Sequence, residues 1–225
     1  GVSPAARTRG TTITAAGLFY NQPARRRFLR TQTTELTWVE KYLTGCALAR
    51  SEVTFTLLHN GNELFHLSAD QSIPERLRGR YGLPGDSRYV KSEGHSGGTS
   101  VKLIWFPDSR WNRKTHQYIL VNGRMIYSGL ISGPVDTAIA GPAGYPLLYC
   151  SVSVPPDEVD VNVHPAKREV RFRKPSAIRE AVESALGELP SSRKNGMTTM
   201  TGKSDYTGIT YERSYEKIHS DDLFN

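Results

Sequence analysis

A lysine inside a strand–loop–strand pattern is the residue of this chain best placed to contact an anion. Val159–Phe172 reads VDVNVHPAKREVRF, and its first valines alternate with polar residues at the period of two that buries one face of a strand. Pro165 lacks a backbone donor and ends this strand, and Val170 resumes the alternation after the loop. Lys167 therefore lies at the end of a rigid strand pair, where its ammonium could reach a group outside its own domain. A β-turn with a solvated lysine is the alternative.

Basic residues elsewhere in the chain favour an anionic partner. The 225 residues carry a formal net charge of +7, with a pI near 9.5. Asp108–Lys114 combines cations with Trp111, and we expect it to form a basic loop suited to a nucleic-acid backbone, although a solvated surface loop is the alternative. Because no element is suited to reading bases, DNA binding should be weak, sequence-independent and sensitive to salt. The cations expected to contact phosphates are Arg25, Arg26, Arg27, Arg110, Arg113, Lys114 and Arg124.

Other kinds of chemistry find no support in the sequence. Cys46 and Cys150 lie far apart without a CxxC pattern, so we expect free thiols and neither a zinc site nor a disulfide. No carboxylate pair or Ser-His-Asp arrangement suggests independent catalysis, and no metal site is expected. No apolar run approaches the length of a membrane span, so we expect an intracellular, cytoplasmic protein.

Periodicity and turn residues predict a succession of helices and strands. Apolar residues recur at helical spacing from Thr34 to Ala49, and Asn60-Gly61 and Asn122-Gly123 are strong hairpin signals. Residues 82–98 are rich in loop-forming residues, and residues 190–225 have the composition of a flexible linker. The expected strands are 11–15, 53–58, 63–67, 99–105, 116–121, 125–127 and 146–155, and the expected helices are 24–29, 34–49, 73–81, 130–140 and one capped by Ser176.

Three stretches of the chain resemble MutL-type DNA mismatch-repair proteins, in the order in which that family has them. They are GTTITAAGLFYNQPARRRFL (10–29), QYILVNGRMIYSG (117–129) and VDVNVHPAKREVRF (159–172), and the resemblance covers roughly residues 9–188. The resemblance implies an α+β fold from the GHKL ATPase superfamily, which includes gyrase and Hsp90-like chaperones. Residues 1–69 would be the C-terminal part of a GHKL ATPase domain, and residues 70–189 a ribosomal-protein-like βαβ transducer domain with a left-handed crossover, followed by the linker at 190–225.

The resemblance also implies site residues and partners. Gly10 and Thr11 would contact the nucleotide at the adenine pocket, and Lys167 would fill the catalytic role by pairing with the γ-phosphate of ATP, which binds with Mg²⁺ in the full-length protein. The motifs expected in the front half of the ATPase domain are not found in the sequence, so this stretch alone is expected to be inactive. DNA, a mismatch-recognition protein of the MutS type and a second copy in a homodimer are the implied partners.

The sequence departs from the family pattern after the Asn122-Gly123 turn. Many family members carry a further basic residue there, where this chain has Ser128 and Gly129, so the location of a DNA groove stays open. A non-enzymatic module that binds nucleic acid or protein without using ATP is the alternative function, because a fold by itself does not choose between the two.

Overall fold

The computed structural model describes residues 9–161 and 169–187. The chain separates into two compact units, Gly1–Glu40 and Lys41–Asn225. Lys167 and the expected linker at 190–225 lie outside the described residues. The expected domain boundary between residues 69 and 70 stays a prediction.

The N-terminal unit has little regular structure. Helix α1 (Pro23–Arg26) begins at a proline, as expected, but it is a single turn without a buried side chain, shorter than the expected helix 24–29. The expected strand at 11–15 is wrong, since these exposed residues pair with no other strand in the part of the chain described. A strand needs a partner for its backbone groups, and its alternation alone does not supply one. Helix α2 (Gln32–Ala49) begins in this unit.

A helix and a hairpin form the first packed element of the second unit. Strands β1 (Phe55–His59) and β2 (Asn62–Leu67) pair antiparallel. Their turn has φ of 52° at Asn60 and 80° at Gly61, the left-handed conformations that the Asn-Gly pair favours. Ala47 of α2 packs with Phe65 and Leu67 of the hairpin in a small apolar cluster.

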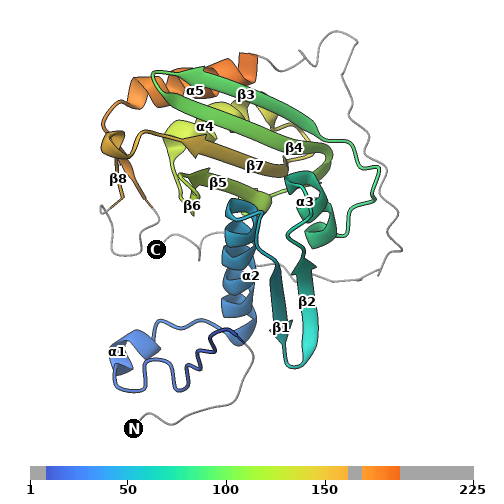
Figure 1. Cartoon of the computed structure of the whole chain (residues 1–225), viewed down its shortest axis with the longest axis vertical. Helices are drawn as coiled ribbons and strands as arrows, with labels where there is room; N and C mark the ends of the chain where they lie inside the picture. The colour runs from blue at the N-terminus through green and yellow to red at the C-terminus, as the bar shows by residue number, and fades with distance from the viewer. Residues whose placement is uncertain (1–8, 162–168, 188–225) are drawn as a thin grey trace. The chain divides into compact units, whose positions relative to one another are not determined.

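A five-stranded mixed sheet is the centre of the second unit (Figure 1). Its order is β3-β4-β7-β5-β6, with β5 and β7 parallel and all other neighbours antiparallel. The chain runs from β5 through α4 to its parallel neighbour β7, a βαβ unit that confirms the expected α+β class. The strands are β3 (Val90–Ser96), β4 (Thr99–Trp111), β5 (Gln117–Val121), β6 (Arg124–Met125) and β7 (Tyr145–Ser153).

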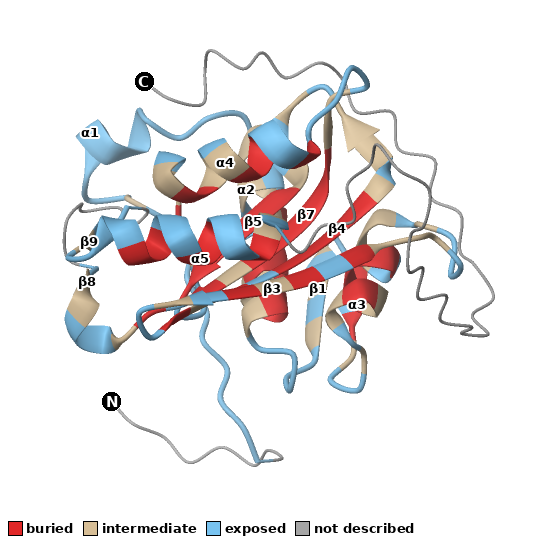
Figure 2. Cartoon of the chain, turned by 90° about the horizontal axis from the view of Figure 1, so that it is seen from above, coloured by how far each residue is buried: buried red, intermediate tan, exposed pale blue. Residues whose placement is uncertain are grey.

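Helices cover the two faces of the sheet unequally. Helices α4 (Gly129–Ile139) and α5 (Pro175–Gly187) pack on one face, against Val101, Leu103 and Trp105 of β4. Helix α3 (Ile73–Tyr81) and the end of α2 pack on the other, against Ile104 and Phe106. Figure 2 shows the buried residues gathered on the strands and on the sides of α3, α4 and α5. Alternate residues of β4 thus pack into two apolar clusters, one on each face of the sheet.

Two strands differ from the expectations. Strand β3 lies where a loop was expected, because its buried positions include Ser92 and Gly94, which give no apolar alternation. A Cβ on Gly94 would come within 2.3 Å of the backbone of both Ala181 and Ala185, so glycine lets α5 approach the strand. Strand β4 continues to Trp111 through a register break between Phe106 and Arg110, so the expected loop 108–114 is mostly strand.

The remaining elements are short. Two 3₁₀ turns, Lys114–His116 and Pro156–Glu158, precede β5 and β8, and β8 (Val159–Asp160) pairs antiparallel with β9 (Arg171–Phe172). Helix α5 begins at Pro175, so Ser176 lies inside the helix and the expected cap at this residue is wrong. Among the described residues, no helix has the length and apolar character needed to cross a membrane.

Candidate functional site

The segment that carries Lys167 has a fixed base. Val159 pairs with Phe172 and Asp160 with Arg171, and both Val159 and Phe172 pack against the main core of the sheet. Below this pair, the backbone N–H of Arg173 donates to the carbonyl of Glu158 at 2.8 Å. The side chain of Lys174 donates to the Glu158 carboxylate at 2.5 Å, and this bond raises the pKa of Lys174. The two strand ends are therefore held together, as the sequence pattern predicts.

The expected nucleotide contacts Gly10 and Thr11 lie in the N-terminal unit. Both residues are exposed, and Gly10 has φ of +150°, a conformation that favours glycine. Nothing lies within 4 Å of the position that a Cβ would take at Gly10. The backbone at this point is exposed, and the role of these residues as nucleotide contacts stays a prediction.

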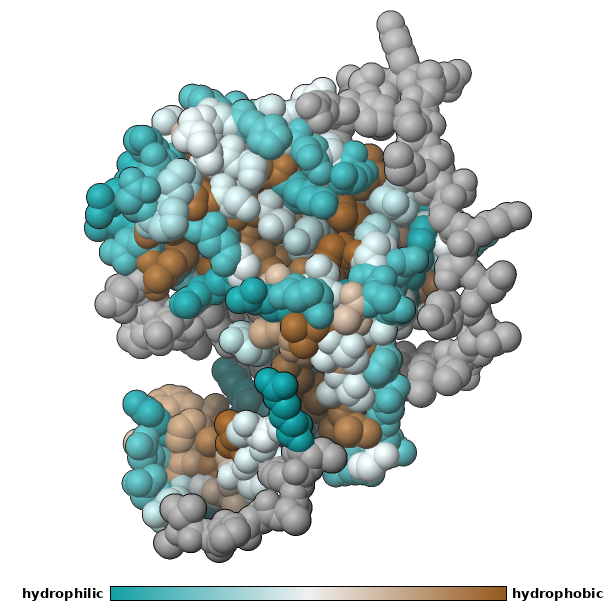
Figure 3. Space-filling model, in the orientation of Figure 1, coloured by the Kyte–Doolittle hydropathy of each residue, from teal (hydrophilic) through white to brown (hydrophobic). Residues whose placement is uncertain are grey.

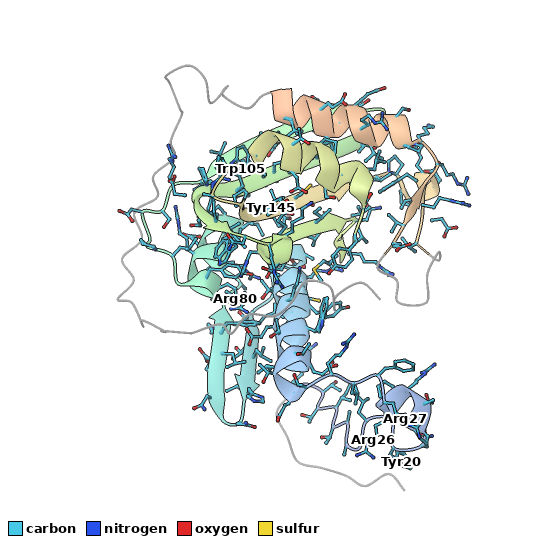
Figure 4. All side chains as sticks on the ribbon, turned by 180° about the vertical axis from the view of Figure 1, so that it is seen from behind. Tyr20, Arg26, Arg27, Arg80, Trp105 and Tyr145 are labelled. Carbon is cyan, nitrogen blue, oxygen red and sulfur yellow. The ribbon has the colours of Figure 1, made fainter. Side chains whose placement is uncertain are left out.

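The arginine cluster Arg25–Arg27 is exposed to solvent. All three residues are exposed on or directly after α1, and Tyr20 and Phe28 nearby are 78% and 81% exposed. Figure 4 shows Tyr20, Arg26 and Arg27 in the same small region of the N-terminal unit. Cations interleaved with exposed aromatic rings suit the backbone and bases of a nucleic acid.

Arg110, another expected phosphate contact, holds the fold together instead of pointing freely into solvent. Its guanidinium donates to the carbonyls of Pro107 at 2.7 Å, Ile139 at 3.1 Å and Gly144 at 3.0 Å. These bonds join the register break of β4 to the end of α4 and the start of β7. Most of the donors that a phosphate would need are therefore occupied.

Lys114 is also engaged within the protein. Its ammonium lies 2.6 Å from a carboxylate oxygen of Asp136, whose side chain is only 11% exposed, and 5.1 Å from the centre of the Tyr145 ring. The other Asp136 oxygen accepts from the Gln117 amide at 2.8 Å. The hydrogen bond to Asp136 raises the pKa of Lys114, so Lys114 stays protonated while the Asp136 carboxylate offsets most of its positive charge.

The other two expected cations differ from each other in exposure. Arg113 is half-buried just after β4, and Arg124 is exposed directly after the second Asn-Gly turn. In that turn the side-chain amide of Asn122 donates to the carbonyl of Val154 at 2.9 Å and accepts from its N–H at 2.8 Å. Arg124 is thus presented from a well-fixed turn. Arg110, Arg113 and Lys114 are neighbours in the sequence at the end of β4, whereas Arg124 lies on a different strand, β6.

Trp111 belongs to an aromatic cluster that the sequence did not predict. Its ring stacks on His116 with centroids 4.0 Å apart and approaches Tyr81 of α3 at 5.9 Å. Burial, and then the charges of Lys41 and Arg80, lower the pKa of His116 to about 4. Trp111 therefore packs within the protein and is not an open platform for a base.

Arg76 is the structural residue that sequence reasoning missed. It is fully buried, at 0% exposure, and no carboxylate forms an ion pair with it in the described part of the chain. Burial lowers the pKa of its guanidinium. The signal in the sequence is its spacing, because Arg76 follows Ile73 by three positions and so shares the apolar face of α3. Its terminal nitrogens donate toward the carbonyls of Ala47, Arg50, Ser51, Val53 and Ser68 at 2.6–3.4 Å.

Comparison with protein families and curated proteins gives consistent matches. Residues 86–190 match the family described as DNA mismatch repair protein, C-terminal domain. The DNA mismatch repair protein MutL of Shewanella loihica is 36% identical over 195 residues, which are 82% of this chain and 31% of that protein. MutL of a Geobacter species, strain M21, is 32% identical over 207 residues, 88% of this chain and 32% of that protein. The chain thus spans about a third of the length of these relatives.

Solved structures agree with the fold. The N terminal domain of a DNA repair protein superposes with a TM-score of 0.60 and 19% identity, over 76% of this chain and 58% of the other. The ATPase domain of the mismatch repair endonuclease MutL from Aquifex aeolicus gives a TM-score of 0.50 and 21% identity, over 73% of this chain and 58% of the other. At these identities the likeness shows a common fold.

Proposed function

We propose that the chain belongs to the family of MutL-type DNA mismatch repair proteins, to which the comparisons show it to be similar, and that the full-length protein is an ATP-dependent matchmaker of mismatch repair. In this role it acts as a homodimer that joins DNA to a mismatch-recognition protein of the MutS type. ATP with Mg²⁺ is its cofactor. Residues 70–189 form the transducer domain that senses the state of the nucleotide.

Lys167 is the residue proposed to do the sensing. A lysine ammonium is a compact point charge that can pair with a terminal phosphate. The observation that supports this role is the base of its segment, where β8 and β9 are paired and packed on the sheet core. Because the two strands are fixed to the core, binding of a phosphate by Lys167 would couple to the position of the whole domain. ATP supplies the γ-phosphate, and its loss on hydrolysis removes the partner of the lysine and loosens the closed arrangement.

The test is nucleotide binding by a form of the protein extended to the length of its relatives. Lys167→Ala should weaken binding of a non-hydrolysable ATP analogue, measured by calorimetry, by roughly 10- to 100-fold, the range expected for a lost charge-assisted hydrogen bond. Arg173→Ala is the matched control, because Arg173 is an exposed cation just beyond β9 whose bond to Glu158 is made by the backbone. Equal affinities for Lys167→Ala and the unmutated protein would contradict the sensing role.

The second part of the proposal is sequence-independent DNA binding. It rests on the exposed cations Arg25–Arg27 and Arg124, which lie on elements with no evident means of reading base edges. Fluorescence anisotropy with a labelled duplex should show affinity that falls steeply as salt rises. An affinity unchanged between low and moderate salt would contradict electrostatic binding. DNA binding by an extended form that binds no ATP analogue would favour the non-enzymatic module.

A further inference from the structure

A polar strip crosses three strands of the sheet on the face packed by α3. Six side chains form it in two cross-strand rows, set by the pairing of β3 with β4 and of β4 with β7. All six retain exposure to solvent, and together they line a shallow pocket of about 190 Å³. The first row is Glu93, Lys102 and Ser151, and the second is His95, Ser100 and Ser153.

The polarity of this strip is built into the strands. In β4, Ser100 and Lys102 alternate with the core residues Val101 and Leu103, and in β7 Ser151 and Ser153 flank the buried Val152. In this part of the strands the apolar side chains therefore point toward α4 and α5, and the polar side chains point to the opposite side, where they are in contact with solvent. Figure 3, which views the molecule from this face, shows hydrophilic and neutral side chains over most of β3 and β4.

With its neighbour Lys91 counted, the strip carries a net positive charge. Lys91 pairs with Glu93 at 2.9 Å, and both side chains are about half exposed. The hydrogen bond from Lys91, then the charges of Lys91, Lys102 and His95, lower the pKa of Glu93. The single carboxylate of the pocket thus lies near two lysines, and Lys91 already offsets its charge. The charge of Lys102 is left in excess, beside the hydroxyl donors of Ser100, Ser151 and Ser153.

This set of donors matches one chemical partner better than others. A lysine and several hydroxyls are the groups with which proteins contact phosphate oxygens without reading sequence. Apart from the buried Val101, the residues that line the pocket are polar or charged, so the strip offers no apolar anchor of the kind that protein interfaces usually need. Its donors also lie on paired strands, so little side-chain and backbone order must be gained on binding.

We propose that this strip of β3, β4 and β7 binds the sugar-phosphate backbone of DNA, with Lys102 as its principal cation. The inference rests on the DNA binding proposed above and adds a surface in the second unit to the exposed arginines. It also offers a place for DNA contacts in a chain that has Ser128 and Gly129 at the expected basic position and engages Arg110 and Lys114 internally.

The experiment compares two charge reversals in the 225-residue chain. Lys102→Glu and Arg179→Glu change the net charge equally, but Arg179 is an exposed residue of α5, the helix on the opposite face of the sheet. Anisotropy with a labelled 20-base-pair duplex should show affinity lowered roughly five- to tenfold by Lys102→Glu, with a much smaller loss for Arg179→Glu. Lys102→Gln should reduce the slope of log affinity against log salt by about 1. Circular dichroism melting checks that each variant is folded.

Glu93→Gln supplies a change of the opposite sign. It removes the carboxylate and releases Lys91, so it should tighten DNA binding. Equal losses for Lys102→Glu and Arg179→Glu would overturn this inference while leaving the proposed DNA binding intact. Failure of the unmutated chain to bind the duplex would contradict the proposed DNA binding and the strip with it. Unchanged DNA affinity of Lys102→Glu, with weakened binding of labelled polyglutamate, would assign the strip to an acidic protein segment instead.

Discussion

Arg76 and the Arg25–Arg27 cluster place the same side chain in opposite surroundings. Arg76 is buried at 0% exposure and donates toward five backbone carbonyls, whereas Arg25–Arg27 lie exposed around a single helical turn without a buried side chain. The carbonyls around Arg76 come from residues 47–68, so it joins α3 to the end of α2 and to the hairpin. Available acceptors, more than residue type, decide whether an arginine supports the fold or is free for a ligand.

The largest effect is expected from removing the buried guanidinium. Arg76→Met should lower the free energy of unfolding by more than about 3 kcal/mol, because it removes a donor from five backbone carbonyls, and each carbonyl left without any donor costs about 1–3 kcal/mol. Urea unfolding followed by tryptophan fluorescence measures the change. Arg76→Lys should recover only part of the loss, since one ammonium cannot reach all five acceptors. Arg179→Met is the exposed control, with a change within about 0.5 kcal/mol. If Arg76→Met lowered the free energy of unfolding by as little as Arg179→Met does, the structural role assigned to Arg76 would be contradicted.

His116 extends the comparison to a half-buried base whose charged form is disfavoured. Its pKa is lowered to about 4 from an unfolded value of 6.5, so the unfolded chain binds more protons between these two values. The contribution of neutral His116 to the free energy of unfolding is complete above pH 6.5. It is lost as the pH falls toward 4, by roughly 3 kcal/mol at most. Unfolding free energies measured from pH 7.5 to 4.5 test this, and His116→Gln should flatten the decline. A decline of the same size in His116→Gln would assign it to other groups.

The smallest expected stability effects separate Arg110 from the exposed cluster. Arg110→Ala should lower stability by about 1–3 kcal/mol through its three carbonyl partners, with little change in DNA affinity. Replacing Arg25, Arg26 and Arg27 together by serine should leave stability within about 0.5 kcal/mol while reducing the salt slope of DNA binding by up to about 3. Urea unfolding and anisotropy on the same samples give both quantities. A DNA-binding loss for Arg110→Ala equal to that of the triple variant would restore Arg110 as a phosphate contact.

The sequence alone determined the features that depend on neighbours along the chain. Both Asn-Gly turns adopt positive φ, and helix α3 has the predicted bounds, because turn and helix preferences act over a few residues. The strand pair around the Lys167 segment and the resemblance to MutL-type proteins could also be read from the printed residues.

Tertiary structure decided the features that depend on residues distant in the chain. Strand β3 forms by pairing with β4, and Gly94 lets α5 pack closely over it, whereas the expected strand at 11–15 has no partner in the described chain. Apart from Pro107, the partners of Arg110 and Lys114 come from 22 to 34 positions away, so no local pattern could show that these cations are engaged. The polar strip likewise arises only when β3, β4 and β7 are in register. The sequence gives the sign of a side chain's charge, but the fold decides which acceptors lie within reach of that side chain.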